Sequence, residues 1–199
     1  MQRMRVLDVE LAWLPLAQVD VATDARLLSA AEAARAGKLR AAERRAEYVA
    51  ARVLLRRVLG DVLGVAPNQL EIAMQAHGKP YVVDATLQFN LSHAGDALLI
   101  GWGSVPLGVD VERAARATRY IERLPLLREL GALGVAPLAA FTLVEAALKA
   151  DGRGLGGLRS LRLLRADQAT CTFELASRRI VAARVALSED YLGAVAAFT

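Results

Sequence analysis

The sequence predicts an α+β fold in which a helical region precedes antiparallel strands in each half of the chain. Residues 38–63 carry apolar side chains at helical spacing, and residues 141–149 are rich in helix formers. Each of these stretches is followed by short strand patterns bounded by turn residues. The change from one half to the other falls at residues 104–106, so we expect two subdomains, 1–104 and 105–199.

The first elements are a strand and two helices. Residues 6–14 alternate as a strand does, and Pro15 ends the pattern. Ser29 and Glu32 have the spacing of a capping box, which predicts the start of a helix. The long helix expected over 38–63 then packs on the first half, with its arginines on the polar side.

A turn with the sequence HGKP, residues 77–80, separates two short strand patterns at 70–73 and 81–83. Glycine supplies permissive backbone angles and proline fixes the residue that follows. We therefore expect Lys79 to be held on a turn, where an ordinary surface lysine is the simplest interpretation.

The densest part of the sequence is residues 89–112. Residues 89–91 read as a strand that stops at Ser92 and His93, and residues 97–102 form a continuous apolar run typical of a buried strand. Gly103 to Pro106 then reverse the chain into the alternating sequence GVDVE.

Asp110 and Glu112 stand two residues apart on this strand and therefore share one face. Two like charges so placed repel each other unless a cation lies between them, and magnesium commonly takes one or two carboxylates together with substrate phosphates. The pattern fits a magnesium site. A solvated edge strand with two surface acids fits it equally well at this point.

The second half begins with a helix that places Glu145 and Lys149 four residues apart on one face, a common surface pair when it stands alone. A glycine cluster follows at residues 152–157. Four antiparallel strands complete the predicted elements, at 158–164, 170–175, 180–187 and 192–198.

Taken as an ordered set, the motifs resemble one family. GKP at 78–80, FNLSHAGD at 89–96, GVDVE at 108–112 and the FxxxEAxxKxxG helix at 141–152 are similar to those of 4′-phosphopantetheinyl transferases of the surfactin-synthetase type. The resemblance runs from about residue 44 to residue 157. It implies a pseudo-dimer of two similar α/β subdomains with the active site between them.

The resemblance also implies a role for particular residues. Asp110, Glu112 and Glu145 would hold Mg²⁺, and Glu145 and Lys149 would be catalytic, as base and as the cation that stabilises the phosphate under attack. The residues that would bind coenzyme A are Lys79, Ser92, His93, Arg44, Arg45 and Lys149. The N-terminal subdomain would then bind the coenzyme A phosphates, and the C-terminal subdomain would supply the metal and catalytic residues.

The implied reaction moves the 4′-phosphopantetheine group of coenzyme A to a serine of an apo acyl or peptidyl carrier protein and releases 3′,5′-ADP. Two other classes stay open: a coenzyme A or nucleotide-binding homologue that has lost carrier transfer, and a magnesium-dependent phosphohydrolase that uses the same acids.

The chain departs from the family pattern at three places. Glu47 stands where an arginine usually helps to hold the 3′-phosphate, and Val144 stands where a lysine is common. The stretch between Glu112 and Glu145 is shorter than usual and lacks the family's paired aromatics. Its residues 114–137 combine arginines with apolar residues. We therefore consider a carrier-docking surface and an ordinary amphipathic helix equally compatible with this segment.

Composition sets the remaining expectations. The chain has 199 residues, of which 55% are hydrophobic and 23% charged, as in globular proteins. A net charge of +4 without a basic patch interleaved with aromatics argues against nucleic-acid binding. No apolar run is long enough to span a membrane, and Asp8 and Glu10 interrupt any signal-peptide core. We expect a cytoplasmic monomer in which Cys171 is a buried core residue.

Overall fold

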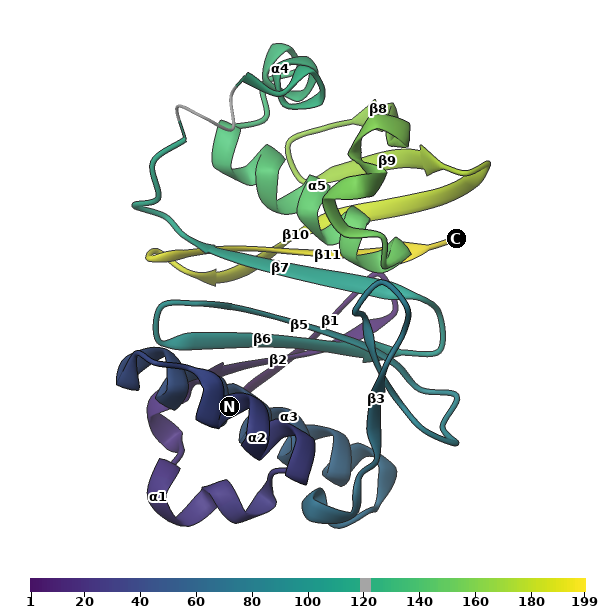
Figure 1. Ribbon diagram of the computed structural model, residues 1–199. Coiled ribbons are helices and arrows are strands. Elements are labelled where there is room, and N and C mark those ends of the chain that lie inside the picture. Colours follow the sequence, from purple (N-terminus) through teal and green to yellow (C-terminus); the bar gives the residue numbers. More distant parts are fainter. Residues whose placement is uncertain (119–122) are drawn as a thin grey trace.

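The computed structural model describes residues 1–118 and 123–199 as two antiparallel sheets that lie against each other between two groups of helices (Figure 1). Helices α1 to α3 lie at one end of the molecule, and α4 and α5 lie at the other (Figure 1). The predicted α+β class is confirmed. In the described part of the chain, no helix is both long enough and apolar enough to cross a membrane.

The first sheet is built from residues 2–103. Its strands, in the spatial order β1-β2-β6-β5, are Gln2–Val6 (β1), Val9–Pro15 (β2), Ala97–Gly103 (β6) and Gln88–Ala94 (β5). Three helices accompany it: Val21–Asp24 (α1), Ala30–Lys38 (α2) and Ala42–Leu63 (α3). A separate hairpin pairs Ile72–Met74 (β3) with Pro80–Val82 (β4).

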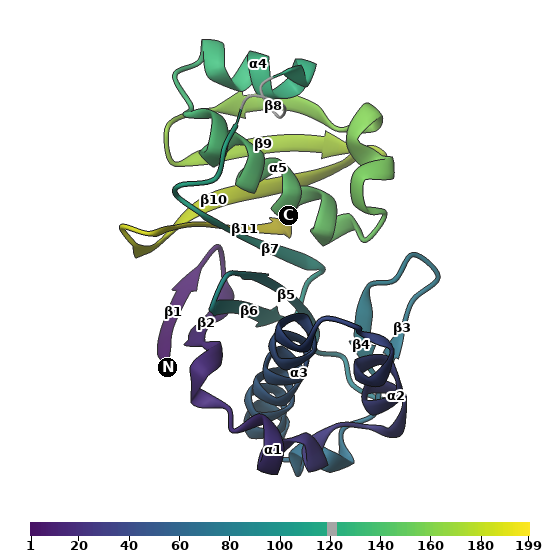
Figure 2. The same ribbon diagram turned by 60° about the vertical axis from the view of Figure 1, so that its left-hand side comes forward.

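The second sheet is built from residues 107–198. Its strands, in the spatial order β7-β11-β10-β9-β8, are Leu107–Arg113 (β7), Tyr191–Phe198 (β11), Arg178–Ser188 (β10), Thr170–Leu175 (β9) and Arg162–Ala166 (β8). Its helices are Pro125–Ala132 (α4) and Pro137–Asp151 (α5), and Figure 2 shows α5 running across the strands.

Three apolar clusters hold these layers together. One lies between α3 and the first sheet, a second lies between α4, α5 and the second sheet, and a third joins the two sheets. The third cluster contains Val9, Leu11 and Leu99 from the first sheet and Leu107, Val109, Val111, Val185, Val195 and Ala197 from the second. Because apolar burial is the main stabilising term in folding, this shared cluster makes the two halves one packed unit.

Several predicted elements are confirmed, and four need correction. The capping box of Ser29 and Glu32 is present, with both hydrogen bonds made. The strand expected over 6–14 is instead a hairpin, because Leu7 and Asp8 form its turn with positive φ angles of 53° and 59°. The long helix begins at Ala42, since Lys38 ends the preceding helix. The strand expected at 158–164 begins at Arg162, because residues 154–160 form a 3₁₀ helix.

The fourth correction has a functional consequence. Strand β5 continues through Ser92 and His93 to Ala94, so these two residues lie on a strand and the turn comes after them. Strands β5 and β7 are edge strands of their respective sheets and lie close together. Side chains on these two edges can therefore reach one another across the junction between the halves.

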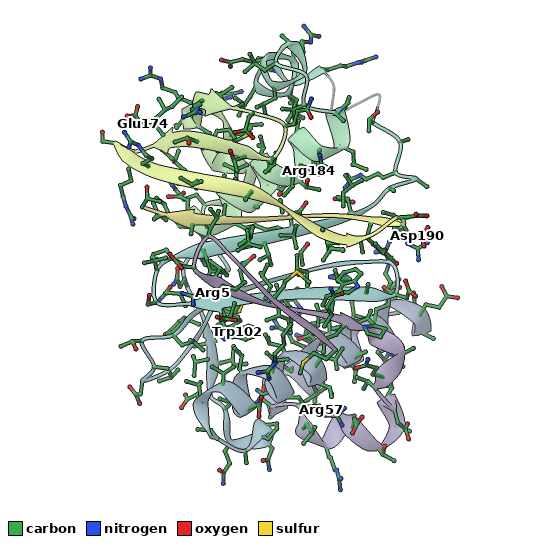
Figure 3. The ribbon with its side chains drawn as sticks, turned by 180° about the vertical axis from the view of Figure 1, so that it is seen from behind. Arg5, Arg57, Trp102, Glu174, Arg184 and Asp190 are labelled. Atoms are coloured by element: carbon green, nitrogen blue, oxygen red, sulfur yellow. The ribbon has the colours of Figure 1, made fainter. Side chains whose placement is uncertain are left out.

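The charged residues seen from behind in Figure 3 belong to the outer surface rather than to this junction. Arg5 of β1 is largely exposed at the edge of the first sheet, and Glu174 of β9 pairs with Arg162 of β8. Arg57 lies on α3 and pairs with Asp24. These are ion pairs in contact with solvent, where each contributes about 1 kcal/mol or less to stability.

Candidate active site

Strands β5 and β7 and helix α5 bring three polar side chains into contact at the junction between the sheets. Lys149 of α5 donates hydrogen bonds to Asp110 Oδ1 of β7 at 2.6 Å and to Ser92 Oγ of β5 at 3.0 Å. Ser92 Oγ also donates to Asp110 Oδ1, at 3.0 Å. Beside them, the Val109 amide donates to Asn90 Oδ1 at 3.0 Å. This hydrogen-bonded cluster therefore combines residues from both halves.

Asp110 is the most buried acid of the cluster, with 3% of its surface exposed. Its Oδ2 is buried and has no hydrogen-bond partner among the described residues. Burial raises the pKa of Asp110, and the nearby Glu112 charge adds to this effect, whereas Lys149 opposes it. A buried acceptor without a partner is costly, so this oxygen is poised to accept a cation or a donor from a ligand.

Glu112 lies one pleat further along β7 and accepts a hydrogen bond from Arg116. The Arg116 guanidinium also lies over the Phe141 ring, 4.7 Å from the ring centroid. Glu112 is partly exposed, in line with its position near the end of the strand. The shared face predicted for Asp110 and Glu112 is confirmed, because the residues between and before them, Val111 and Val109, point into the cluster between the sheets.

Glu145 projects from α5 one helical turn before Lys149. It is half-buried, and burial raises the pKa of its carboxyl, with the charges of Asp110 and Glu112 raising it further. Lys149 and Arg116 act in the opposite direction. A raised pKa makes a carboxylate a stronger base, and the position of Glu145 beside an open cavity suits it to the role of a general base.

Asp110, Glu112 and Glu145, the predicted metal ligands, line the same cavity, but their side chains are not arranged around a common point as metal ligands would be. No group of three His, Cys, Asp or Glu side chains in residues 1–118 and 123–199 has the arrangement of a metal site. The physical reason lies in the neighbours: Lys149 takes one oxygen of Asp110, and Arg116 takes Glu112. These two cations balance charge that a metal ion would otherwise balance.

Two adjoining cavities open at this junction. The smaller, of about 460 Å³, is lined by Asp110, Glu112, Glu145, Lys149, Ser92, His93, Leu91, Val111, Arg116 and Phe141. The larger, of about 700 Å³, lies between the α3 side of the first half and the end of α5. Both cavities are lined by Leu91, His93 and Lys149, so a single ligand can extend from one into the other.

The larger cavity brings together four of the predicted coenzyme A residues and leaves out Arg45 and Ser92, of which Ser92 lines the smaller cavity. Arg44 and His93 lie on its wall, together with His77. Arg45 does not line it, because the Arg45 guanidinium donates to the Leu39 carbonyl at 2.9 and 3.2 Å. Glu47, which stands where the family has an arginine, lies on the wall as well.

Lys79 differs most from the sequence-based expectation. It lines the larger cavity, but only 8% of its surface is exposed, and its Nζ donates to the backbone carbonyls of Leu107 and Ala150 at 2.9 and 2.8 Å. It is therefore buried between the halves and is not a surface lysine on a turn. A turn motif in the sequence gives the position of a backbone but not the partner of a long side chain.

Arg52 lines the larger cavity, although the sequence analysis treated it only as one of the arginines on the polar side of the long helix. Its guanidinium lies 5.6 Å from the centroid of the Tyr48 ring, and its Nε is 3.8 Å from Glu32. Glu32 is bound more closely by Arg56, at 2.7 Å. The available signal was spacing, because Arg44, Tyr48 and Arg52 recur every four residues on α3 and therefore share a face.

The segment 114–137 contributes to the core. Leu126, Leu127 and Leu130 of α4 are buried in the cluster beneath α5, so these apolar residues are not available for docking. Arg116 is engaged by Glu112 and Phe141. Arg119 and Ile121, which were considered for the docking surface, lie outside the described residues.

Comparison with known proteins identifies a family to which this arrangement is similar. Residues 11–101 match the family model described as the N-terminal region of 4′-phosphopantetheinyl transferase. The chain is 33% identical over 156 residues to the 4′-phosphopantetheinyl transferase HetI of Nostoc sp., which covers 70% of this chain and 65% of that protein. It is 34% identical over 164 residues to a phosphopantetheinyl transferase of Thraustochytrium sp., covering 68% of this chain and 57% of that protein.

A third relative extends the same pattern. A putative 4′-phosphopantetheinyl transferase of Synechocystis sp. is 29% identical over 146 residues, or 66% of this chain and 59% of the relative. The chain therefore matches less than two thirds of the length of each of these three curated relatives.

Proposed function

We propose that this chain, which is similar to 4′-phosphopantetheinyl transferases, transfers the phosphopantetheine group of coenzyme A to a serine of an apo carrier protein. The observation that carries the proposal is the contact between Ser92, Asp110 and Lys149 beside Glu145, where one Asp110 oxygen has no partner among the described residues and Asp110 lines the smaller cavity. Phosphoryl transfer needs such a concentration of charged groups around the reacting phosphate.

The proposed binding mode places the adenosine end of coenzyme A in the cavity of about 700 Å³ and the pyrophosphate where the two cavities meet. His93 and Lys149 line both cavities and are proposed to contact the pyrophosphate. Ser92 is proposed to orient Lys149 through their hydrogen bond. A cavity between two subdomains is a common place for a small-ligand site.

Arg44 and Arg52 are proposed to take over the phosphate contact that the family assigns to the position of Glu47. Both arginines line the cavity, whereas Arg45 is held by the Leu39 carbonyl. Arg52 and Arg56 share the single carboxylate of Glu32, so one positive charge remains uncompensated by that acid. A phosphate group of the ligand would balance this charge.

A magnesium ion fits the chemistry of the acids at the junction. The fit rests on the buried Asp110 Oδ2, which has no partner within residues 1–118 and 123–199, and on the carboxylates of Glu112 and Glu145, since oxygen ligands of this kind suit Mg²⁺. Asp110, Glu112 and Glu145 are proposed to hold it, with Lys149 and Arg116 releasing their carboxylates. When bound, the ion would neutralise negative charge that develops on the pyrophosphate.

The protein's own residues are proposed to do the rest of the chemistry. Glu145 removes the proton from the carrier serine hydroxyl, whose oxygen forms a bond to the phosphorus that bears pantetheine. The bond from that phosphorus to the bridging oxygen breaks, and 3′,5′-ADP leaves with the electron pair. Lys149, once turned from Asp110 to the phosphate, stabilises the charge on the oxygens around the reacting phosphorus.

The organisation into two halves supports the surfactin-synthetase type of transferase. Residues 1–104 are proposed as the subdomain that binds coenzyme A phosphates, and residues 105–199 as the subdomain that supplies the metal ligands and Glu145. We propose that the two halves form a pseudo-dimer and that the protein acts as a monomer, because residues of one chain line both sides of the cavities.

The intact mass of a carrier protein tests the proposal. The purified protein is incubated with coenzyme A, Mg²⁺ and apo acyl or peptidyl carrier protein, and each carrier is weighed. Transfer adds one phosphopantetheine group to the carrier. Cleavage of coenzyme A without a gain in carrier mass would indicate a phosphohydrolase, and bound but intact coenzyme A would indicate a binding protein; either result would contradict the proposal.

A further inference from the structure

Lys79, a residue of the first half, binds the C-terminal end of helix α5. The side chain comes from the turn before β4 and is buried, and its Nζ donates to the carbonyls of Leu107 and Ala150 at 2.9 and 2.8 Å. Leu107 begins strand β7, and Ala150 is the penultimate residue of α5. One ammonium group thus joins a strand and a helix that both belong to the other half.

The Ala150 carbonyl is one of the last four of α5, which have no partner within the helix. A lysine ammonium at this end satisfies that carbonyl and also complements the negative end of the helix dipole. Burial lowers the pKa of Lys79 to about 8, opposed by the charge of Asp151. Even the neutral amine keeps two N–H donors, which is the number of carbonyls it serves.

Two glycines show how closely strand and helix approach at this point. A Cβ at Gly108 would lie 2.1 Å from the Ala146 carbonyl oxygen, so the backbones of β7 and α5 are in direct contact there. Gly152 ends α5 with a φ of +88°, and a Cβ on it would lie 3.3 Å from Lys79 Cδ. The Lys79 stem therefore packs against the turn that ends the helix.

From these contacts we infer that Lys79 is a positioning residue, which sets how β7 lies against α5 and thereby holds Asp110 in place relative to Glu145 and Lys149. Asp110 follows Leu107 by three residues of strand, about 10 Å. Glu145 precedes Ala150 by five residues of helix, about 7.5 Å. Both connections are short segments of regular secondary structure. A displacement of the Leu107 or Ala150 backbone at the Lys79 contact therefore displaces Asp110 or Glu145 by a similar distance.

This inference rests on the proposed function for its catalytic consequence, and it gives Lys79 a role other than the phosphate contact implied by the family resemblance. If Lys79 were a phosphate-binding residue, its N–H groups would donate to coenzyme A, and removal of Lys79 would weaken coenzyme A binding. A positioning residue would leave binding largely intact and slow the chemical step, because a misplacement of about 1 Å can cost about 10²-fold in rate.

The first test compares wild type with Lys79→Met, which keeps the stem and removes the donors. We expect kcat to fall by about 10- to 100-fold, while the Kd of coenzyme A changes by less than about threefold. In the free protein, hydrogen exchange should become faster at residues 107–112 and 145–152. A large rise in Kd, with kcat and exchange unchanged, would overturn the inference.

Chemical rescue provides the matched control. Lys79→Cys in a Cys171→Ala background is treated with bromoethylamine, which restores an amine at nearly the original position. The treated variant should recover kcat and slow exchange, and the Cys171→Ala protein treated in the same way should not change. Failure of the restored amine to recover either quantity would contradict the positioning role.

A measurement on the wild type avoids variants that fold poorly. The chain contains three lysines, Lys38, Lys79 and Lys149, so ¹³C-labelled lysine gives three side-chain signals. Addition of coenzyme A should shift the Lys149 signal and leave that of Lys79 unchanged; a shift of Lys79 as large as that of Lys149 would overturn the inference. If wild type modifies no carrier, the proposed function fails, and hydrogen exchange of Lys79→Met still decides the positioning role.

Discussion

Two buried carboxylates, each paired with a long cation, have opposite surroundings in this molecule. Glu32 accepts hydrogen bonds from the Ser29 amide at 3.0 Å and from Arg56 Nε at 2.7 Å, and Arg52 lies beside its other oxygen. Asp110 accepts from Lys149 and Ser92 on one oxygen, and its other oxygen has no partner among the described residues.

The cations of the two pairs, Arg56 and Lys149, also differ in burial and in their number of hydrogen-bond partners. Arg56 is fully buried and also donates to the Pro67 and Leu70 carbonyls at 2.8 and 2.9 Å, although its Nη2 has no partner in the described part of the chain. Lys149 has 28% of its side chain exposed and borders both cavities. The comparison indicates that the Glu32 pair fixes α2 and residues 67–70 to α3, whereas the Asp110 pair is left open to a ligand.

The largest expected effect is on activity, at the pair of Asp110 and Lys149, which we call the open pair. Replacing Asp110 with Asn removes the charge that is proposed to hold Mg²⁺, so kcat/KM for transfer should fall by about 10²-fold or more. Asp61→Asn, which alters an exposed acid of α3, is the matched control and should retain full activity. Equal rates for wild type and Asp110→Asn would show that the Asp110 pair has no role in the reaction.

The next largest effect is on stability, at the buried pair of Glu32 and Arg56. Arg56→Met leaves Glu32 and two carbonyls without their donor, so the free energy of unfolding should fall by about 3–5 kcal/mol. The neighbouring Arg57→Met removes a partly exposed pair with Asp24 and should cost about 1 kcal/mol or less. Denaturant unfolding of both variants measures the difference, and similar losses would show that Arg56 has no special structural role.

Magnesium should stabilise the fold through the open pair. A ligand that binds only the folded state at about 100 times its Kd adds about 2.7 kcal/mol to the free energy of unfolding. We expect Mg²⁺ to raise the Tm of wild type and of Arg57→Met, but not that of Asp110→Asn. A rise of equal size in Asp110→Asn would place the ion elsewhere.

The smallest effect is a dependence of stability on pH in metal-free protein. The pKa of Asp110 is raised above 3.8 in the folded state, so the folded protein keeps this proton at pH values where the unfolded chain has lost it. Asp110 should therefore make the free energy of unfolding fall as pH rises from about 3.8 through the raised pKa, by about 1.4 kcal/mol for each unit of the shift.

Asp110→Asn lacks this titration and is the reference for the measurement. The stability of Asp110→Asn relative to wild type should increase with pH across this window and then level off. Denaturant unfolding of both proteins between pH 4 and pH 8, with EDTA present, gives the difference. A difference that decreases with pH would mean that Lys149 outweighs burial at Asp110.

Much of the fold could be predicted because local patterns determined it. The capping box at Ser29 predicted the start of α2, and the alternation in GVDVE predicted which residues of β7 face the other sheet. The first hairpin was missed because its turn uses Leu7 and Asp8 at positive φ, where glycine or asparagine is the usual signal.

The candidate site was predictable to a lesser extent. Spacing predicted that Asp110 and Glu112 share a face and that Glu145 and Lys149 lie one helical turn apart. Spacing could not show that Lys149 binds Asp110 or that Lys79 reaches the end of α5, because those partners are 39 and 71 residues away in the sequence. Contacts of that kind depend on how the two halves pack.

The central claim is that the open pair at Asp110 serves phosphopantetheinyl transfer, and product stoichiometry tests it most directly. Wild type and Asp110→Asn are each incubated with coenzyme A, Mg²⁺ and an apo carrier protein, and both 3′,5′-ADP and modified carrier are quantified over time. The account predicts that wild type forms the two products in equal amounts and that Asp110→Asn forms almost none of either. Release of 3′,5′-ADP without modified carrier, or equal product from both proteins, would contradict it.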